Sequence, residues 1–118
     1  MGVKQTLAAK QGIGLMDSSI DIKHACLTGL NVTLVASAGN DGKAAFPRYP
    51  AAYPEVIAVT AVDQDLNVYD RAAQGAHIEL AAPGVNILIA KGQAYGSLSG
   101  TSLAAAMVTA VLASDTAT

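Results

Sequence analysis

Residues 31–42, which read NVTLVASAGNDG, contain the pattern that decides the fold. The first seven of these residues are apolar on both faces and rich in β-branched side chains, which predicts a strand buried in a parallel sheet. The glycine-containing remainder ends that strand. The same pattern recurs in residues 56–62 (VIAVTAV), and two further short strands are predicted at residues 78–81 and 85–90. The chain therefore contains the strands of a mainly parallel sheet.

Two segments have helical patterns. Residues 18–29 predict an amphipathic helix with Ser18 as its N-cap and Gly29 at its end. Residues 102–113 are helical in composition and apolar almost all round, which predicts a helix buried on every side. Residues 92–100 are rich in Gly and Ser and predict a loop. Strands alternating with helices and long loops indicate an α/β layered fold.

Composition limits the function classes. The chain has 118 residues, enough for about one small domain. Its 52% hydrophobic content excludes a wholly disordered chain, and its net charge of −2 argues against nucleic-acid binding. No apolar run is long enough to span a membrane. The single cysteine, Cys26, predicts a small buried side chain rather than a reactive thiol, and it has no partner for an internal disulfide.

The loop before the second helix places a serine where chemistry is favourable. Ser102 follows Gly100 and Thr101 at the start of an apolar helix. The first N–H groups of a helix are free and carry its positive dipole end, so they would stabilise an oxyanion that forms beside Ser102. The alternative is that Ser102 only caps the helix, a common role for serine. This motif alone leaves both readings open.

The loop after the first buried strand offers a neutral donor. The side chain of Asn40 carries N–H groups at the carboxyl end of a sheet strand, where binding sites of such folds lie. The alternative is an ordinary turn, because Asn, Asp and Gly are the usual turn residues.

Together, four blocks of sequence resemble the second half of a subtilisin-like serine peptidase. These blocks are the strand that leads into Ala38-Gly39-Asn40, residues 49–62, residues 82–85 (APGV) and residues 99–104 (SGTSLA). Their order and spacing both agree with that family. The resemblance covers residues 18–113, whereas residues 1–17 are an uninformative leader. It implies an incomplete subtilisin-like α/β fold that holds only the C-terminal half of the peptidase domain.

The resemblance also implies roles for individual residues. Ser102 matches the nucleophile, and Asn40 matches the side-chain donor of the oxyanion hole, with the N–H of Ser102 as second donor. Arg48 falls at the far wall of the substrate pocket, where it either faces inward and favours an acidic substrate side chain or, as we expect, points to solvent. Tyr49-Pro50 matches a cis proline. The stretch that matches the lining of the substrate pocket consists of Ala36, Ser37, Ala38 and Gly39.

The acid and base of the catalytic triad are not recognisable. The family carries them upstream, at an Asp-containing strand end and at a His-Gly-Thr helix start. Asp17, Asp21 and Asp41 have other surroundings, His24 is followed by Ala-Cys, and His77 comes after the Asn loop. We therefore expect negligible turnover from the isolated chain, because the loss of a triad member leaves only a small residual rate.

Two functions from different classes follow. The first is a part of a serine endopeptidase that acts on a peptide or protein substrate. The second is a non-catalytic pseudopeptidase or association module, whose partner is the missing N-terminal half or a second copy of the chain. Ala106 and Met107 stand where the family commonly has Pro and His, a variation that favours the second function slightly. No cofactor is expected, although the resemblance allows calcium bound through loop carbonyls, and the sequence indicates no compartment.

Overall fold

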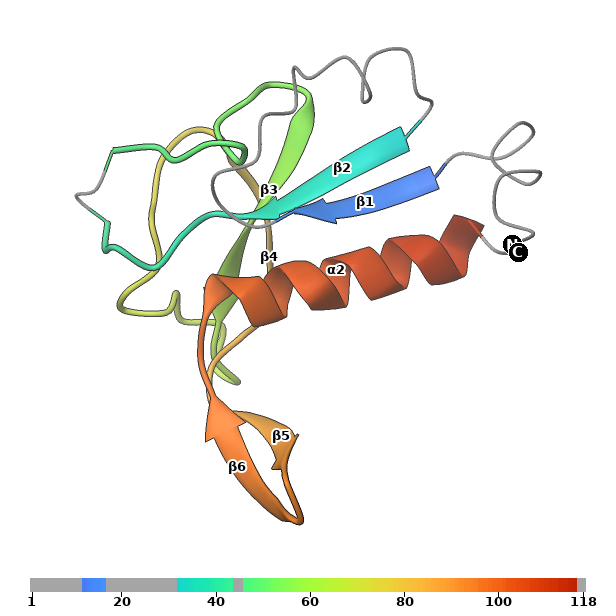
Figure 1. Cartoon of the computed structure of the whole chain (residues 1–118). Coiled ribbons are helices and arrows are strands. Elements are labelled where there is room, and N and C mark those ends of the chain that lie inside the picture. The colour runs from blue at the N-terminus through green and yellow to red at the C-terminus, as the bar shows by residue number, and fades with distance from the viewer. Residues whose placement is uncertain (1–11, 17–31, 44–45, 117–118) are drawn as a thin grey trace.

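The sheet is four-stranded and parallel. The computed structural model describes residues 12–16, 32–43 and 46–116. The four strands of the sheet lie side by side in the order in which they occur along the chain (Figure 1). They are β1 (Gly12–Met16), β2 (Val32–Ser37), β3 (Val56–Val62) and β4 (Ile78–Pro83). The sequence predicted a layered α/β fold with a mainly parallel sheet, and the parallel pairing of these strands confirms it.

Small side chains form the core on both faces of the sheet. One face packs Ala36 and Ala58 against Ala51 and Val56. The other face packs the sheet against helix α2 (Thr101–Thr116). Its buried residues are Val35, Val59, Ala61, Ala82, Ala104 and Ala105. Because most of these residues are alanines, the helix lies close to the sheet, and its first turn is held against the loop that follows β2.

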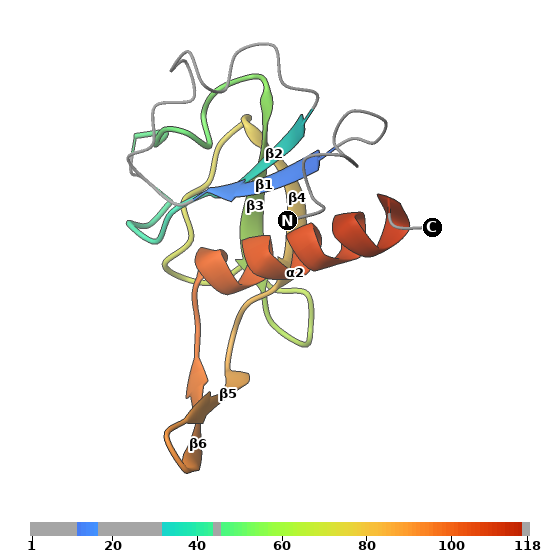
Figure 2. The same cartoon turned by 45° about the vertical axis from the view of Figure 1, so that its right-hand side comes forward.

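Helix α2 covers the sheet with one side only. Figure 2 shows the helix running across a single face of the sheet. Ala104 and Ala105 are fully buried there, whereas Met107 and Val111 are 37% and 67% exposed. The prediction of a helix buried on every side is therefore wrong for the described residues, because no other described layer packs against the outer side of the helix. The outer side remains apolar.

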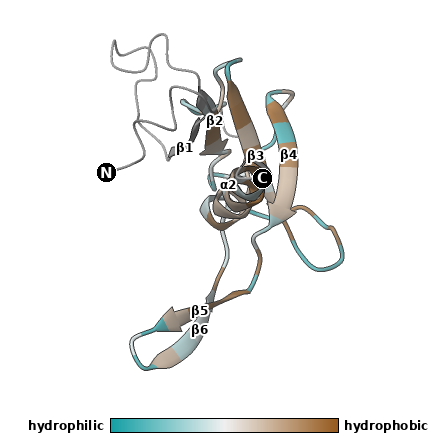
Figure 3. Cartoon of the chain, turned by 90° about the vertical axis from the view of Figure 1, so that its right-hand side faces the viewer, coloured by the Kyte–Doolittle hydropathy of each residue, from teal (hydrophilic) through white to brown (hydrophobic). Residues whose placement is uncertain are grey.

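A β-hairpin replaces most of the predicted loop at residues 92–100. Strand β5 (Ile87–Lys91) pairs antiparallel with β6 (Ala94–Leu98) through the two-residue connection Gly92-Gln93. Gly92 has a φ of 64°, which suits glycine at the first position of such a turn. Figure 3 shows the hairpin projecting away from the sheet and α2. The strand predicted at residues 85–90 exists, but it belongs to this separate hairpin and not to the parallel sheet.

Two further differences between sequence and structure concern the N-terminal part of the chain. Strand β1 was not predicted, because its small and apolar residues show no clear period. The predicted helix at residues 18–29, with Cys26 and His24, lies outside the described residues. Within the part that the structure describes, no helix has the length and apolar character needed to cross a membrane.

Candidate active site

Asn40 joins the end of β2 to the start of α2. Its side-chain oxygen Oδ1 accepts a hydrogen bond from the backbone N–H of Thr101 at 3.0 Å and another from Thr101 Oγ1 at 3.0 Å. Thr101 Oγ1 in turn accepts a bond from the N–H of Gly39 at 3.1 Å. Because Oδ1 accepts a backbone N–H, the orientation of the amide is fixed. Its Nδ2 group is therefore the remaining side-chain donor, and it lies on the side of the amide away from these bonds.

Thr101 is the residue that sequence analysis missed. It is fully buried and makes three hydrogen bonds to two groups of the loop after β2, the N–H of Gly39 and Oδ1 of Asn40. The available signal is the threonine between Gly100 and Ser102, whose hydroxyl is a polar group at the start of an apolar helix. Its contacts show that the hydroxyl anchors Asn40, so the donor is held by the helix start itself.

Ser102 lies in the first turn of α2 and is exposed. The helix begins at Thr101, one residue before it, and the N–H of Thr101 is bonded to Asn40. Ser102 is therefore inside the helix rather than preceding it as an N-cap would. Its hydroxyl and its backbone N–H are placed at the positive end of the helix dipole.

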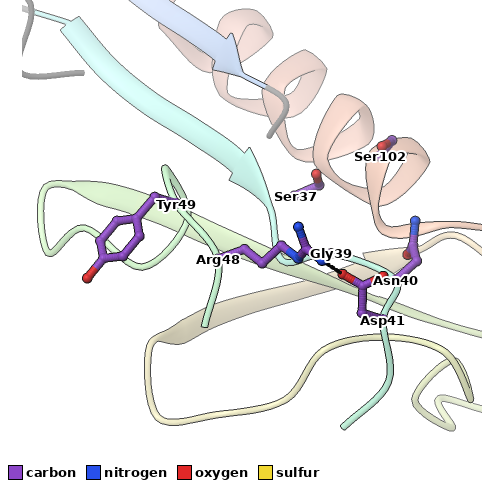
Figure 4. Close-up of a pocket in the computed structure, with 7 residues that line it drawn as sticks. All are labelled: Ser37, Gly39, Asn40, Asp41, Arg48, Tyr49 and Ser102. Carbon is purple, nitrogen blue, oxygen red and sulfur yellow. Dashed lines mark ion pairs between the residues drawn. The ribbon is translucent and has the colours of Figure 1, made fainter. Parts of the chain in front are cut away.

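A pocket of about 250 Å³ opens beside Asn40 and Ser102. Figure 4 shows the side chains around it. Among the predicted pocket residues, Ala36 and Ala38 are fully buried and do not line it. The alternation of side chains along an extended chain explains this, since neighbouring residues face opposite sides. The lining residues are Ser37, Gly39, Asn40, Asp41, Arg48, Tyr49 and Ser102.

Arg48 lines the pocket, and its side chain is also partly exposed to solvent. Its guanidinium group forms an ion pair with Asp41, while the ring of Tyr49 points away from the pair (Figure 4). Both charged side chains are about half exposed. The peptide bond between Tyr49 and Pro50 is cis, which confirms that prediction.

Gly84 fixes the position of the Gly-Thr-Ser loop. The N–H of Gly100 donates to the carbonyl oxygen of Gly84 at 2.8 Å, and the N–H of Gly84 donates to the carbonyl of Val62 at 3.1 Å. A Cβ atom on Gly84 would lie 2.6 Å from Ala61 Cβ and 2.7 Å from the Gly100 carbonyl oxygen. Only a residue without a side chain allows this approach.

We expect Gly84→Ala to destabilise the chain by about 1–3 kcal/mol, because the added methyl group overpacks a buried contact that includes backbone atoms. Chemical denaturation measures the change. Gly96→Ala is the matched control, since its Cβ would meet only the flexible Lys91 side chain, at 3.6 Å. The control should remain within about 0.5 kcal/mol of the parent. Equal stability of both variants and the parent would contradict the tight packing at Gly84.

Among the described residues, no histidine lines this pocket, and its one carboxylate, that of Asp41, is paired with Arg48. His77 directly precedes β4, is partly buried and is absent from the lining. Over residues 12–16, 32–43 and 46–116, no group of three His, Cys, Asp or Glu side chains could hold a metal ion. The described site therefore brings the Ser102 hydroxyl and the Asn40 side chain to one pocket.

The chain is similar to known proteins over most of its length. The model of the subtilase family matches residues 8–115. Halolysin of Haloferax mediterranei is 44% identical over 80 residues, which are 66% of this chain and 15% of that protein. The thermostable alkaline protease of Halalkalibacterium halodurans is 45% identical over 83 residues, or 70% of this chain and 23% of the relative.

Longer matches extend the likeness over most of the chain. Subtilisin DY of Bacillus licheniformis is 34% identical over 106 residues, 86% of this chain and 37% of that protein. The solved structure of the prenylagaramide maturation protease PagA superimposes with a TM-score of 0.69 at 30% identity, covering 92% of this chain and 44% of the other. This chain thus spans less than half the length of each of these relatives.

Proposed function

The chain belongs to the subtilase family, and we propose that it supplies the nucleophile and the oxyanion hole of a serine endopeptidase. In this proposal Ser102 is the nucleophile, and the Nδ2 group of Asn40 and the N–H of Ser102 are the two donors. The catalytic acid and base come from a second part that this chain does not contain. The substrate is a peptide or protein, as the family implies.

The proposed reaction is acyl transfer. Ser102 Oγ attacks the carbonyl carbon of the scissile peptide bond, and its proton passes to the base of the second part. The carbonyl oxygen becomes an oxyanion that accepts hydrogen bonds from the two donors. The base then protonates the leaving amine, the C–N bond breaks, and an acyl-Ser102 ester remains. Water hydrolyses the ester and restores the serine.

The fixed amide of Asn40 is the observation that supports this proposal most. Its Oδ1 is occupied by two bonds from Thr101, so its Nδ2 is available without any rearrangement. A donor that is oriented before the reaction stabilises the transition state with no cost of reorganisation. The pocket between Asn40 and Ser102 provides the space for the reacting carbonyl.

A complementation experiment tests the proposal. The chain is mixed with the separately produced N-terminal part of a homologous subtilisin, which carries the acid and base. A fluorophosphonate probe is added, and intact mass is followed by peptide mapping. We expect labelling at Ser102 with the second part present and negligible labelling without it. Absence of labelling in the mixture, although the two parts form a stable complex, would overturn the proposed role.

An association module is the second candidate, and one observation favours it. An apolar groove of about 340 Å³ runs between β4 and the outer side of α2. Its lining includes Leu80, Met107 and Val111, which are all substantially exposed. Large exposed apolar surfaces mark interaction sites. A stable complex without labelling at Ser102 in the experiment above would support this second function.

A further inference from the structure

We propose that Asp41-Gly42 is a site of isoaspartate formation, that two contacts of the folded chain slow this reaction, and that conversion displaces Asn40. Asp41-Gly42 is the one Asp-Gly step in the sequence. Glycine favours the reaction because it has no side chain to shield its backbone nitrogen. The modification is independent of the proposed function, and only its effect on catalysis rests on that function.

The reaction needs no partner other than water. The backbone nitrogen of Gly42 attacks the side-chain carbon Cγ of Asp41, and a C–N bond forms. One carboxylate oxygen leaves as water, with the proton of the Gly42 N–H and a second proton from solvent. The product is a cyclic succinimide. Water then adds to either ring carbonyl, breaks its C–N bond and releases a proton. Opening at the backbone carbonyl gives isoaspartate, whereas opening at Cγ restores aspartate.

The ion pair with Arg48 opposes the first step. The carboxylate of Asp41 is paired with the Arg48 guanidinium group (Figure 4). The alkyl chain of Arg48 passes beside Gly39, with Cδ 4.0 Å from the place where a Cβ of Gly39 would lie, which keeps the guanidinium group near the loop. Ring closure removes the negative charge of the carboxylate, so the ion pair is lost. Its contribution therefore adds to the barrier, and for a half-exposed pair this contribution is modest.

A hydrogen bond to the attacking nitrogen opposes the same step. The N–H of Gly42 donates to the carbonyl oxygen of Arg71 at 2.8 Å. Ring closure consumes this proton, and the succinimide nitrogen carries none, so the hydrogen bond is lost together with the ion pair. Both contacts exist only in the folded chain. We therefore expect the unfolded chain to react faster than the folded one.

Conversion lengthens a stretch of backbone that is held at both ends. The carbonyl oxygen of Gly39 and the N–H of Gly42 each form a backbone hydrogen bond of 2.8 Å with residues 71–73. Isoaspartate adds one carbon atom to the backbone between these two bonds, directly after Asn40. The Oδ1 atom of Asn40 lies 3.0 Å from both the nitrogen and Oγ1 of Thr101. We therefore expect the longer backbone to shift Asn40 and to break its bonds to Thr101.

Ageing of the full chain at neutral pH tests the inference. Samples are taken over weeks, and peptide mapping with electron-transfer fragmentation distinguishes isoaspartate from aspartate at position 41. Intact mass detects the succinimide by the loss of one water. Deamidation of the neighbouring Asn40 changes the final mass, whereas conversion of Asp41 to isoaspartate does not, so the two reactions are separable. The parent chain is compared folded and unfolded in denaturant.

Three variants assign the effect. Arg48→Ala should raise the rate of the folded chain about threefold, the effect of one half-exposed ion pair. Arg48→Lys is the matched control, because it keeps a cation for Asp41 and should react at nearly the parent rate. Asp41→Glu keeps a carboxylate but would have to close a larger ring, so it should show no conversion. The unfolded parent should react faster than folded Arg48→Ala, since it lacks both contacts.

The outcomes separate each part of the inference. Absence of isoaspartate at position 41 in the unfolded parent would overturn the site. Equal rates in folded parent and Arg48→Ala would overturn the role of the ion pair. An unchanged backbone amide NMR signal of Thr101 in the converted chain would overturn the displacement of Asn40. If converted chains lose fluorophosphonate labelling in the complemented enzyme, the effect on catalysis is supported. If unconverted chains are not labelled either, the proposed function fails while the mapping result stands.

Discussion

Replacing Ser102 by alanine in the complemented enzyme is expected to lower turnover of a peptide anilide by about 10⁶-fold, the loss known for the nucleophile of subtilisin itself, which belongs to this family. The substitution removes the oxygen that forms the acyl ester. The oxyanion donors remain, so a small residual rate over water should persist. Steady-state hydrolysis by the complex, measured with the parent chain and the variant in parallel, gives the ratio.

The same variant should leave the fold unchanged. Ser102 is exposed in the first turn of α2, and exposed substitutions of this kind alter stability by no more than about 0.5 kcal/mol. The denaturation midpoint of the isolated chain and the affinity for the second part are therefore the controls. If Ser102→Ala retains turnover close to that of the parent complex, another group performs the attack and the assignment of Ser102 is wrong.

The central strands were predictable from local sequence because burial on both faces leaves a distinctive pattern. Residues 31–37 and 56–62 are continuous apolar runs with many β-branched residues, and they form β2 and β3 within one residue of the predicted limits. The resemblance of the four blocks to a subtilisin-like peptidase implied that Asn40 lies beside Ser102 at the helix start. Parallel strands bring such loops together at the carboxyl edge of the sheet.

The hairpin and the outer side of α2 were not predictable by the same reasoning. Strand β6 is largely exposed, so burial leaves no apolar alternation in its sequence, and only pairing with β5 defines it. Composition shows that α2 is apolar on all sides, but it does not show which of these sides pack against other elements of the chain. Thr101 was missed because its role depends on contacts with residues about 60 positions away.

We assign two tasks to Asn40, and a single substitution can separate them. Its Oδ1 accepts the bonds that anchor the start of α2. In the proposed mechanism its Nδ2 donates to the oxyanion. Asn40→Asp keeps acceptor oxygens for Thr101 but replaces the donor by a second carboxylate oxygen. Asn40→Ala removes both. The two variants therefore share the loss of the oxyanion donor and differ in the anchoring of the helix.

We expect Asn40→Asp to keep stability within about 1 kcal/mol of the parent, because a carboxylate near a helix N-terminus is favourable. Asn40→Ala should lose about 1–3 kcal/mol, since it leaves the buried N–H of Thr101 without its acceptor. Chemical denaturation compares the two. A loss of stability in Asn40→Asp as large as that in Asn40→Ala would contradict anchoring through Oδ1.

Activity in the complemented enzyme should depend on whether the Nδ2 donor is present and not on the stability of the variant. Both variants are expected to lower kcat by at least about 10²-fold, the lower limit known for this donor in subtilisin itself. Asn40→Asp should show the larger loss, because its negative charge repels the developing oxyanion and the N–H bond is gone. A stable Asn40→Asp variant with kcat near that of the parent would show that Nδ2 does not stabilise the oxyanion. A stable variant with the expected loss would assign the two ends of one amide to two functions, one for folding and one for catalysis.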